Sequence, residues 1–236
     1  MKWVNKILIL ILGICHSVYT FGVYVPRVQE CVEKKILNFF TKWRSGEALP
    51  FLFPSLEAIE INSVVGQYTE NGVKVSYVTG DMILTGAKNF TVKDLIANDQ
   101  LEVYGTAHFP LLNLTGDNYH LQGRAYVFYY LKGAGSMLLN LHNVKMVFGI
   151  KFVPHGVGTK VHDSQLNFTV GAIEVNLENS MWPINKVLNS DGLSLIHKYK
   201  KTLVDSIKRR ITTTLDQFLG KVPPEQVSYI FDDNCV

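Results

Sequence analysis

The histidines and the glycine-rich turns are the residues of this chain that could support catalysis or nucleotide binding. No histidine has a neighbour at the spacing of a metal site or of a catalytic triad. The turn Gly133-Ala134-Gly135-Ser136 lacks the G-x-S-x-G order of a nucleophile elbow. We therefore expect a protein that is not an enzyme and that has no metal site and no cofactor. The histidines weighed are His108, His120, His142, His155, His162 and His197.

Asparagines and cysteines could carry covalent modifications of a different kind. Three Asn-x-Thr sequons predict N-glycosylation at Asn89, Asn113 and Asn167. Cys31 and Cys235 could form a disulfide that ties the two ends of the chain together. Two free thiols are the other interpretation, and the sequence does not decide between them.

The first twenty residues have the three parts of a secretory signal peptide. A positively charged start precedes an unbroken apolar run over residues 7–14, which is far shorter than the ~20 residues of a membrane span. Cleavage is expected after Ser17 or Thr20. We therefore expect a secreted, extracellular protein with a signal peptide over residues 1–20 and a single domain over residues 21–236.

The composition of the chain excludes several classes of protein. Apolar residues make up 47% of the 236 positions and charged residues only 18%, so the chain can bury a large core and is not intrinsically disordered. The formal net charge is +3, and no long basic or acidic tail occurs. Nucleic acid is therefore not an expected partner.

A central region with a two-residue period follows a first helix, which is expected over residues 26–43. Alternation of apolar and polar residues predicts antiparallel strands within residues 59–177. The segments that alternate are 73–77, 101–109, 119–130, 137–152 and 164–177. Turns are expected between them at 70–72, 115–118, 132–135 and 155–158. The predicted strands are unusually long, since twelve residues extend over about 40 Å.

The last element is predicted to be one long helix. Its apolar stripe extends over some 26 residues, about 39 Å, after Asn189-Ser190-Asp191, which offer N-capping side chains. The helix and the strands match in length. We therefore expect an α+β fold in which an elongated, highly curved antiparallel sheet wraps around this helix.

Several segments of the sheet are apolar on both faces, and residues 125–130 are apolar at all six positions. Such strands must be covered on both sides or must line an interior space. A thick, filled core is one interpretation, and an internal hydrophobic tunnel that binds a hydrophobic ligand is the other. The residues predicted to line the tunnel are Val75, Tyr77, Val103, Phe109, Val127, Tyr129, Leu139, Leu141, Phe168, Val170, Trp182, Ile196, Leu203, Ile207 and Ile211.

A cationic run on the last helix has two interpretations. It could be a solvated helix face, or it could dock to an acidic membrane surface or partner. The residues of this run are His197, Lys198, Lys200, Lys201, Lys208, Arg209 and Arg210.

Several segments, in their order and spacing, resemble the insect takeout and juvenile hormone-binding proteins. The segments that carry the resemblance are 53–61, 111–119, 121–124, 131–135, 175–179 and 184–189, followed by the long helix. Two features differ from the family pattern. Cys31 has no cysteine partner about seven residues earlier, and Ser180-Met181-Trp182-Pro183 stands where an aromatic-Asn-Gly stretch is common.

The resemblance implies a secreted carrier with a tubular lipid-binding (TULIP-like) fold. Such a carrier would bind a small hydrophobic ligand, for example a lipid, a fatty acid or a juvenile hormone-like terpenoid, in an internal tunnel. We expect it to act as a monomer, and transient contact with a membrane or receptor is left open. The alternatives are an extracellular interaction protein with a filled core, a lipid sensor that uses the cationic helix, and a secreted hydrolase with an unrecognised triad.

Overall fold

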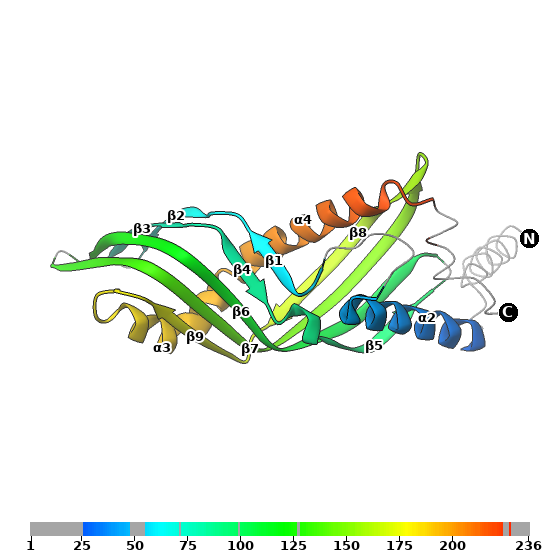
Figure 1. The fold of residues 1–236 in the computed structure, drawn as a ribbon, viewed down its shortest axis with the longest axis horizontal. Coiled ribbons are helices and arrows are strands. Elements are labelled where there is room, and N and C mark those ends of the chain that lie inside the picture. The colour runs from blue at the N-terminus through cyan, green and yellow to red at the C-terminus, as the bar shows by residue number, and fades with distance from the viewer. Residues whose placement is uncertain are drawn as a thin grey trace, which may run out of the picture.

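The fold is an elongated, strongly curved antiparallel sheet with helices along it and at one end (Figure 1). The computed structural model describes residues 26–47, 55–70, 72–98, 100–126, 128–223 and residue 227. Within them, helix α2 lies at one end of the body, and two consecutive helices run along its length. This is the predicted α+β architecture, and the sheet is not closed into a barrel.

Nine strands and three α-helices occur in the described residues. The helices are α2 (Pro26–Ser45), α3 (Ile184–Lys198) and α4 (Lys200–Leu219), and a short 3₁₀ turn, η1, covers Ala87–Asn89. The strands are β1 (Ala58–Ile61), β2 (Val65–Glu70), β3 (Val73–Thr79), β4 (Met82–Thr85), β5 (Thr91–Ala97), β6 (Glu102–Ala125), β7 (Tyr129–His155), β8 (Gly158–Thr169) and β9 (Ala172–Leu177).

Strands β6 and β7 form the central pair of the sheet and are longer than the sequence predicted. They contain 24 and 27 residues and pair from Glu102↔Lys151 to Ala125↔Tyr129. The predicted turns at 115–118 and 132–135 are therefore wrong. The first is a bulge, where the register shifts between Gly116 and Tyr119, and the second is continuous strand. The predicted turns at 70–72 and 155–158 are confirmed.

The predicted single C-terminal helix consists of two helices that meet at Tyr199. Helix α3 begins at Ile184, so the expected capping residues 189–191 lie inside it. Asn189 instead contacts the edge strand β9: its Oδ1 accepts a hydrogen bond from Val175 N, and its Nδ2 donates one to Val175 O, both at 2.8 Å. Asn185 Oδ1 accepts from Leu177 N at 2.9 Å. These amides satisfy backbone groups that an edge strand would otherwise leave unpaired.

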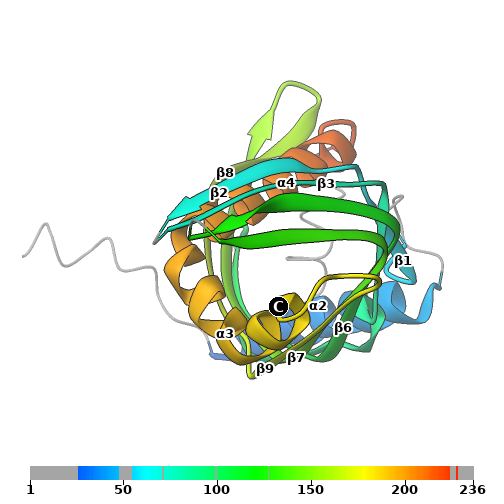
Figure 2. The same cartoon turned by 90° about the vertical axis from the view of Figure 1, so that its left-hand side faces the viewer.

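Helix α4 and the junction at Tyr199 lie across the opening between two edges of the sheet (Figure 2). On one side, Asp216 Oδ1 of α4 accepts a hydrogen bond from Val161 N of β8 at 2.7 Å. On the other side, Arg210 Nη2 donates to the carbonyl of Glu60 in β1 at 2.8 Å. Lys198 and Tyr199 both contact the carboxylate of Glu70 in β2. A helix, rather than a strand, therefore seals the sheet.

Replacing Glu70 with alanine is expected to loosen this seal. The change removes the ion pair with Lys198 and the hydrogen bond from Tyr199, which together should contribute about 1 kcal/mol to the free energy of unfolding. Hydrogen exchange of the amides around Tyr199 should accelerate. The matched control is Glu60→Ala, because only the main-chain carbonyl of Glu60 takes part in its contact. Equal exchange rates in the two variants would contradict this role.

Candidate functional site

An apolar cavity of about 280 Å³ lies between helix α2, strands β6 and β7, and helix α4. The described residues that form its walls are all hydrophobic. The lining residues are Ile36, Phe39, Phe40, Trp43, Leu56, Ala87, Phe90, Val103, Ala107, Phe109, Met146, Phe148, Ile150, Phe152, Ile211, Leu215, Leu219 and Val227. A site of this composition can bind a ligand through burial of apolar surface, and it offers no group for acid–base or nucleophilic chemistry.

Phe90 is the centre of an aromatic wall on one side of the cavity. It follows η1 and is 7% exposed. Its ring lies 5.8 Å from that of Phe40, 6.4 Å from that of Trp43 and 5.9 Å from that of Phe109. Phe40 also packs edge-on against Phe148 of β7 at 6.4 Å. The wall therefore joins α2 to both long strands of the sheet.

Helix α2 is held over the cavity by its apolar stripe and by one polar contact. Val32 and Ile36 are buried in a core cluster with Leu95, Ala97 and further residues of the sheet and the C-terminal segment. Near the end of the helix, Arg44 Nη1 donates a hydrogen bond to the carbonyl of Phe90 at 3.2 Å. The residues of α2 that line the cavity are thereby fixed relative to the aromatic wall.

Of the residues predicted to line a tunnel, the structure brings Val103, Phe109 and Ile211 together in this cavity. Five of the predicted residues lie outside the cavity and are half-buried: Leu139, Leu141, Phe168, Val170 and Ile196. Val75 is buried near the opposite end of the sheet. The surface positions are Tyr77, Tyr129, Trp182, Leu203 and Ile207. Val127 lies outside the described residues.

The alternation of strand β7 reverses between the two halves of the molecule. Met146, Phe148 and Ile150 line the cavity, so the even positions face it. In the other half the odd positions face the core, because Met137 packs against the cluster around Ile184 of α3. The change falls at Asn143, which has a φ of 51°, in the left-handed region. This reversal explains why strict alternation did not find Met146, Phe148 and Ile150.

The predicted modification sites differ in exposure, and one of them lies outside the described residues. Asn89 and Asn167 are exposed, and Asn113 is half-buried. Cys31 is disulfide-bonded, but Cys235 lies outside the described residues, so a pairing of these two stays a prediction. Glycan attachment also stays a prediction.

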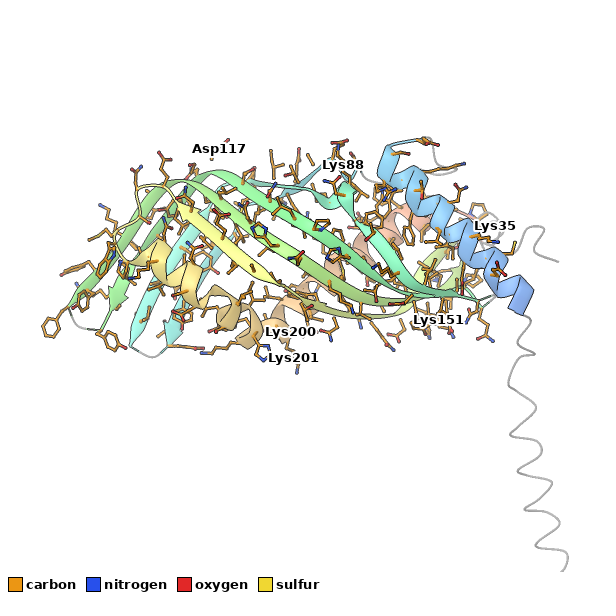
Figure 3. All side chains as sticks on the ribbon, turned by 90° about the horizontal axis from the view of Figure 1, so that it is seen from below. Lys35, Lys88, Asp117, Lys151, Lys200 and Lys201 are labelled. Atoms are coloured by element: carbon orange, nitrogen blue, oxygen red, sulfur yellow. The ribbon has the colours of Figure 1, made fainter. Side chains whose placement is uncertain are left out.

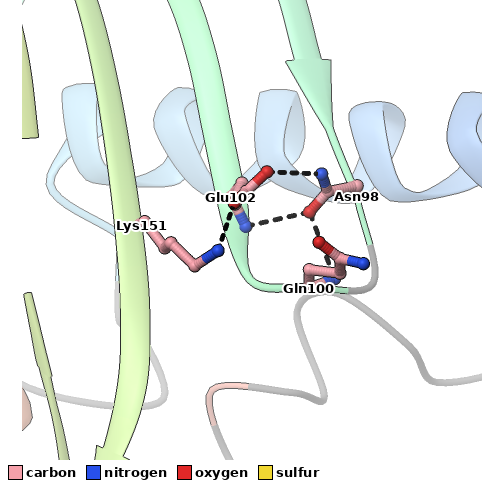
Figure 4. Close-up of polar contacts among 4 residues, drawn as sticks. All are labelled: Asn98, Gln100, Glu102 and Lys151. Carbon is pink, nitrogen blue, oxygen red and sulfur yellow. Dashed lines mark hydrogen bonds and ion pairs between the residues drawn. The ribbon is translucent and has the colours of Figure 1, made fainter. Parts of the chain in front are cut away.

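Beside the cavity wall, a polar network fixes the turn between β5 and β6 (Figure 4). Asn98 Oδ1 accepts hydrogen bonds from the backbone N–H groups of Gln100 and Glu102, both at 3.1 Å. Lys151 Nζ lies 2.6 Å from Glu102 Oε1, and Asn98 Nδ2 donates to Glu102 Oε2 at 2.9 Å. These two donors hold the pKa of the Glu102 carboxyl below its ordinary value, although partial burial opposes them.

Glu102→Gln is expected to lower the free energy of unfolding at neutral pH and to make it less dependent on acidic pH. A carboxyl whose pKa is lowered in the folded state stabilises the fold above its ordinary pKa, and this contribution is lost as the pH falls through the lowered value. The variant should lose about 1 kcal/mol at neutral pH, and its deficit against the parent should shrink in acid. Urea unfolding at neutral and at acidic pH measures the deficit. Glu60→Gln, at an exposed position, is the control. A deficit that is independent of pH would contradict the assignment.

The cationic run lies along the middle of the molecule, where Figure 3 shows Lys200 and Lys201 at the junction of α3 and α4. Lys198 and Arg210 of this run contact β2 and β1 as described above. In the part of the chain that the structure describes, no group of three or more His, Cys, Asp or Glu side chains could hold a metal ion. Among the described helices, none has the length and hydropathy needed to cross a bilayer.

Comparison with known proteins relates this chain to one family. The family model described as "Haemolymph juvenile hormone binding protein (JHBP)" matches residues 20–227. The chain belongs to this family. The resemblance inferred from the sequence segments is thereby confirmed. A search of curated proteins found no match.

One solved structure confirms the fold of this juvenile hormone binding protein family member. The crystal structure of Takeout 1 from Epiphyas postvittana is similar with a TM-score of 0.63 and 15% sequence identity, over 84% of this chain and 94% of that chain. At this identity the likeness shows the fold alone. A structure of lipopolysaccharide binding protein matches with a TM-score of 0.38 and 13% identity, over 84% of this chain and 38% of that chain.

Proposed function

We propose that this protein is a secreted, non-catalytic carrier that binds a small hydrophobic ligand such as a lipid, a fatty acid or a terpenoid. The observation that carries the proposal is the apolar lining that the described residues give to the 280 Å³ cavity. This volume is close to the lower end of the ~300–1,000 Å³ of small-molecule sites. The family name, with its reference to hormone binding, is consistent with such a ligand.

Burial of apolar surface is sufficient to give useful affinity. A ligand that buries ~400 Å² of apolar surface gains about 10 kcal/mol at ~25 cal/mol per Å². The loss of translational and rotational freedom costs at least ~4 kcal/mol. The difference of about 6 kcal/mol corresponds to a dissociation constant of roughly tens of micromolar, which permits both binding and release.

The binding site is proposed to extend from the cavity along the concave face of the sheet. Phe168 pairs with Met146, which lines the cavity, so their side chains lie on the same face. Further along the sheet, Leu139 and Leu141 pair with Val175 and Ile173 of β9. These half-buried residues would form the wall of a tunnel if a longer ligand separated them from α3.

Secretion is supported by the N-terminal apolar run, the three sequons and the family's haemolymph description. The exposed positions of Asn89 and Asn167 are compatible with glycans. The signal peptide over residues 1–20 lies outside the described residues and remains part of the proposal.

Extraction of the purified secreted protein with organic solvent, followed by mass spectrometry, tests the carrier function. We expect a reproducible lipid or terpenoid at near-equimolar amount, and displacement of a fluorescent fatty acid by the extracted compound. An empty extract together with no binding of the fluorescent fatty acid would favour a filled core without cargo. Turnover of ester substrates by the purified protein would instead favour a hydrolase.

A further inference from the structure

The hairpin between β6 and β7 carries large apolar side chains exposed to solvent. Tyr126, Phe128, Tyr129 and Tyr130 are 68%, 83%, 64% and 63% exposed. This hairpin forms the end of the molecule opposite α2 (Figure 1). Large apolar side chains that gather on a protruding turn mark an interaction surface rather than a core.

A second exposed segment lies next to this hairpin. Met181 and Trp182 are 47% and 79% exposed. The segment is held against β7, because Met181 N donates a hydrogen bond to the carbonyl of Lys132 at 2.8 Å. The turn before it is tied to the same strand, since the Glu178 carboxylate accepts hydrogen bonds from Ser136 N and Oγ. The six exposed side chains of the hairpin and this segment are called the aromatic tip below.

Three cations share one face of the sheet directly behind the aromatic tip. Lys74 pairs with Arg124, and Arg124 pairs with Tyr130 on the next strand. Paired residues lie on the same face, and so do positions two apart, which adds Lys132 to this face. The guanidinium carbon of Arg124 lies 4.8 Å from the centre of the Tyr130 ring.

A groove of about 820 Å³ lies between these cations. It is lined by Lys74, Arg124 and Lys132, together with neutral residues that include Tyr126 and Tyr130 of the aromatic tip. Among the described residues that line it, none carries a carboxylate. The groove is therefore complementary to anionic groups.

We propose that this end of the molecule docks onto the surface of an anionic phospholipid membrane. The aromatic tip would enter the interfacial region, where Tyr and Trp are favoured because they combine an apolar ring with a polar group. The cations behind it would then face the lipid phosphates. The cationic run of α3 and α4 is a weaker candidate, because two of its members already contact the sheet. Docking does not require cargo and goes beyond the carrier function.

Vesicle sedimentation with the full secreted chain tests the proposal. We expect binding to phosphatidylcholine vesicles that contain phosphatidylserine, weaker binding to phosphatidylcholine alone, and a decrease with added salt. The double substitution Phe128→Ser and Tyr129→Ser should weaken binding at least about tenfold. The matched control is Val157→Ser, on the turn between β7 and β8, because Val157 is also 83% exposed. It should bind like the parent.

Charge and fluorescence provide independent readouts if the double variant folds poorly. Arg124→Gln and Lys132→Gln should each weaken binding to the anionic vesicles about fivefold. With Trp182 of the tip replaced by phenylalanine in both proteins, the emission of a Phe128→Trp variant should shift to shorter wavelength on anionic vesicles, and the emission of Val157→Trp should not.

Three outcomes would overturn membrane docking. They are a parent that does not bind anionic vesicles, a double variant that binds as the parent does, and self-association of the parent that the tip substitutions abolish. The last would make a second copy of the chain the partner. Binding of the fluorescent fatty acid should be unchanged in the tip variants, which separates this test from that of the carrier function.

Discussion

Replacing Ala107 with phenylalanine is expected to lower the affinity for a fluorescent fatty acid by about 100-fold. Ala107 lies on β6, lines the cavity and is 6% exposed. A ring at this position would occupy space that a ligand needs, and a ligand that buries about 110 Å² less apolar surface loses roughly this factor. Overpacking should cost about 1–3 kcal/mol of stability, so the fold should persist. Fluorescence titration measures the affinity.

The control for this substitution is Ala172→Phe at an exposed position of β9. It adds the same ring to the same sheet but outside the cavity, and it should leave the affinity unchanged. Parent-like affinity in folded Ala107→Phe would show that the fatty acid binds somewhere else. A circular dichroism melt shows whether each variant is folded.

Phe90→Ala is expected to cost about 3–5 kcal/mol of the free energy of unfolding. The substitution removes the ring that contacts Phe40, Trp43 and Phe109 at once. Because these rings come from a helix and from the sheet, they cannot close the space without moving α2. Urea unfolding measures the loss, and a variant that remains folded should accept bulkier ligands.

The matched control is Phe128→Ala, which removes an identical ring from a side chain that is 83% exposed. Its free energy of unfolding should stay within about 0.5 kcal/mol of the parent. Similar losses in the two variants would contradict the placement of Phe90 at the centre of the wall.

Patterns within short stretches of the sequence predicted several elements of the fold. The apolar stripe of α2, the alternation of β3 and the turns at 70–72 and 155–158 follow from side-chain period and from glycine. In β8, exposed Asn167 alternates with half-buried Leu166 and Phe168, as the sequon and a period of two indicate.

Long-range features could not be predicted in the same way. Residues 125–130 have the composition of a buried strand, but they include a turn, because Tyr126 adopts a φ of 55° and Phe128 is exposed. The aromatic tip is exposed although its apolar composition is typical of a buried strand. Such exceptions are common at interaction surfaces. Trp43 and Phe90 belong to the cavity only because α2 packs beside η1, and no pattern in one sequence shows such a contact.

In the proposed carrier, the contact that α4 makes across the open side of the sheet would affect how wide a ligand the protein can hold. In a barrel closed by strands, the hydrogen-bond register fixes the circumference. Here a few side chains, among them Glu70, Arg210 and Asp216, set the position of the helix. The space that the proposed carrier encloses between sheet and helix could therefore widen or narrow by a shift of one helix, without breaking the ladder between any two strands. Molecules of different girth could be accommodated by the same sheet, with the change concentrated at those polar contacts.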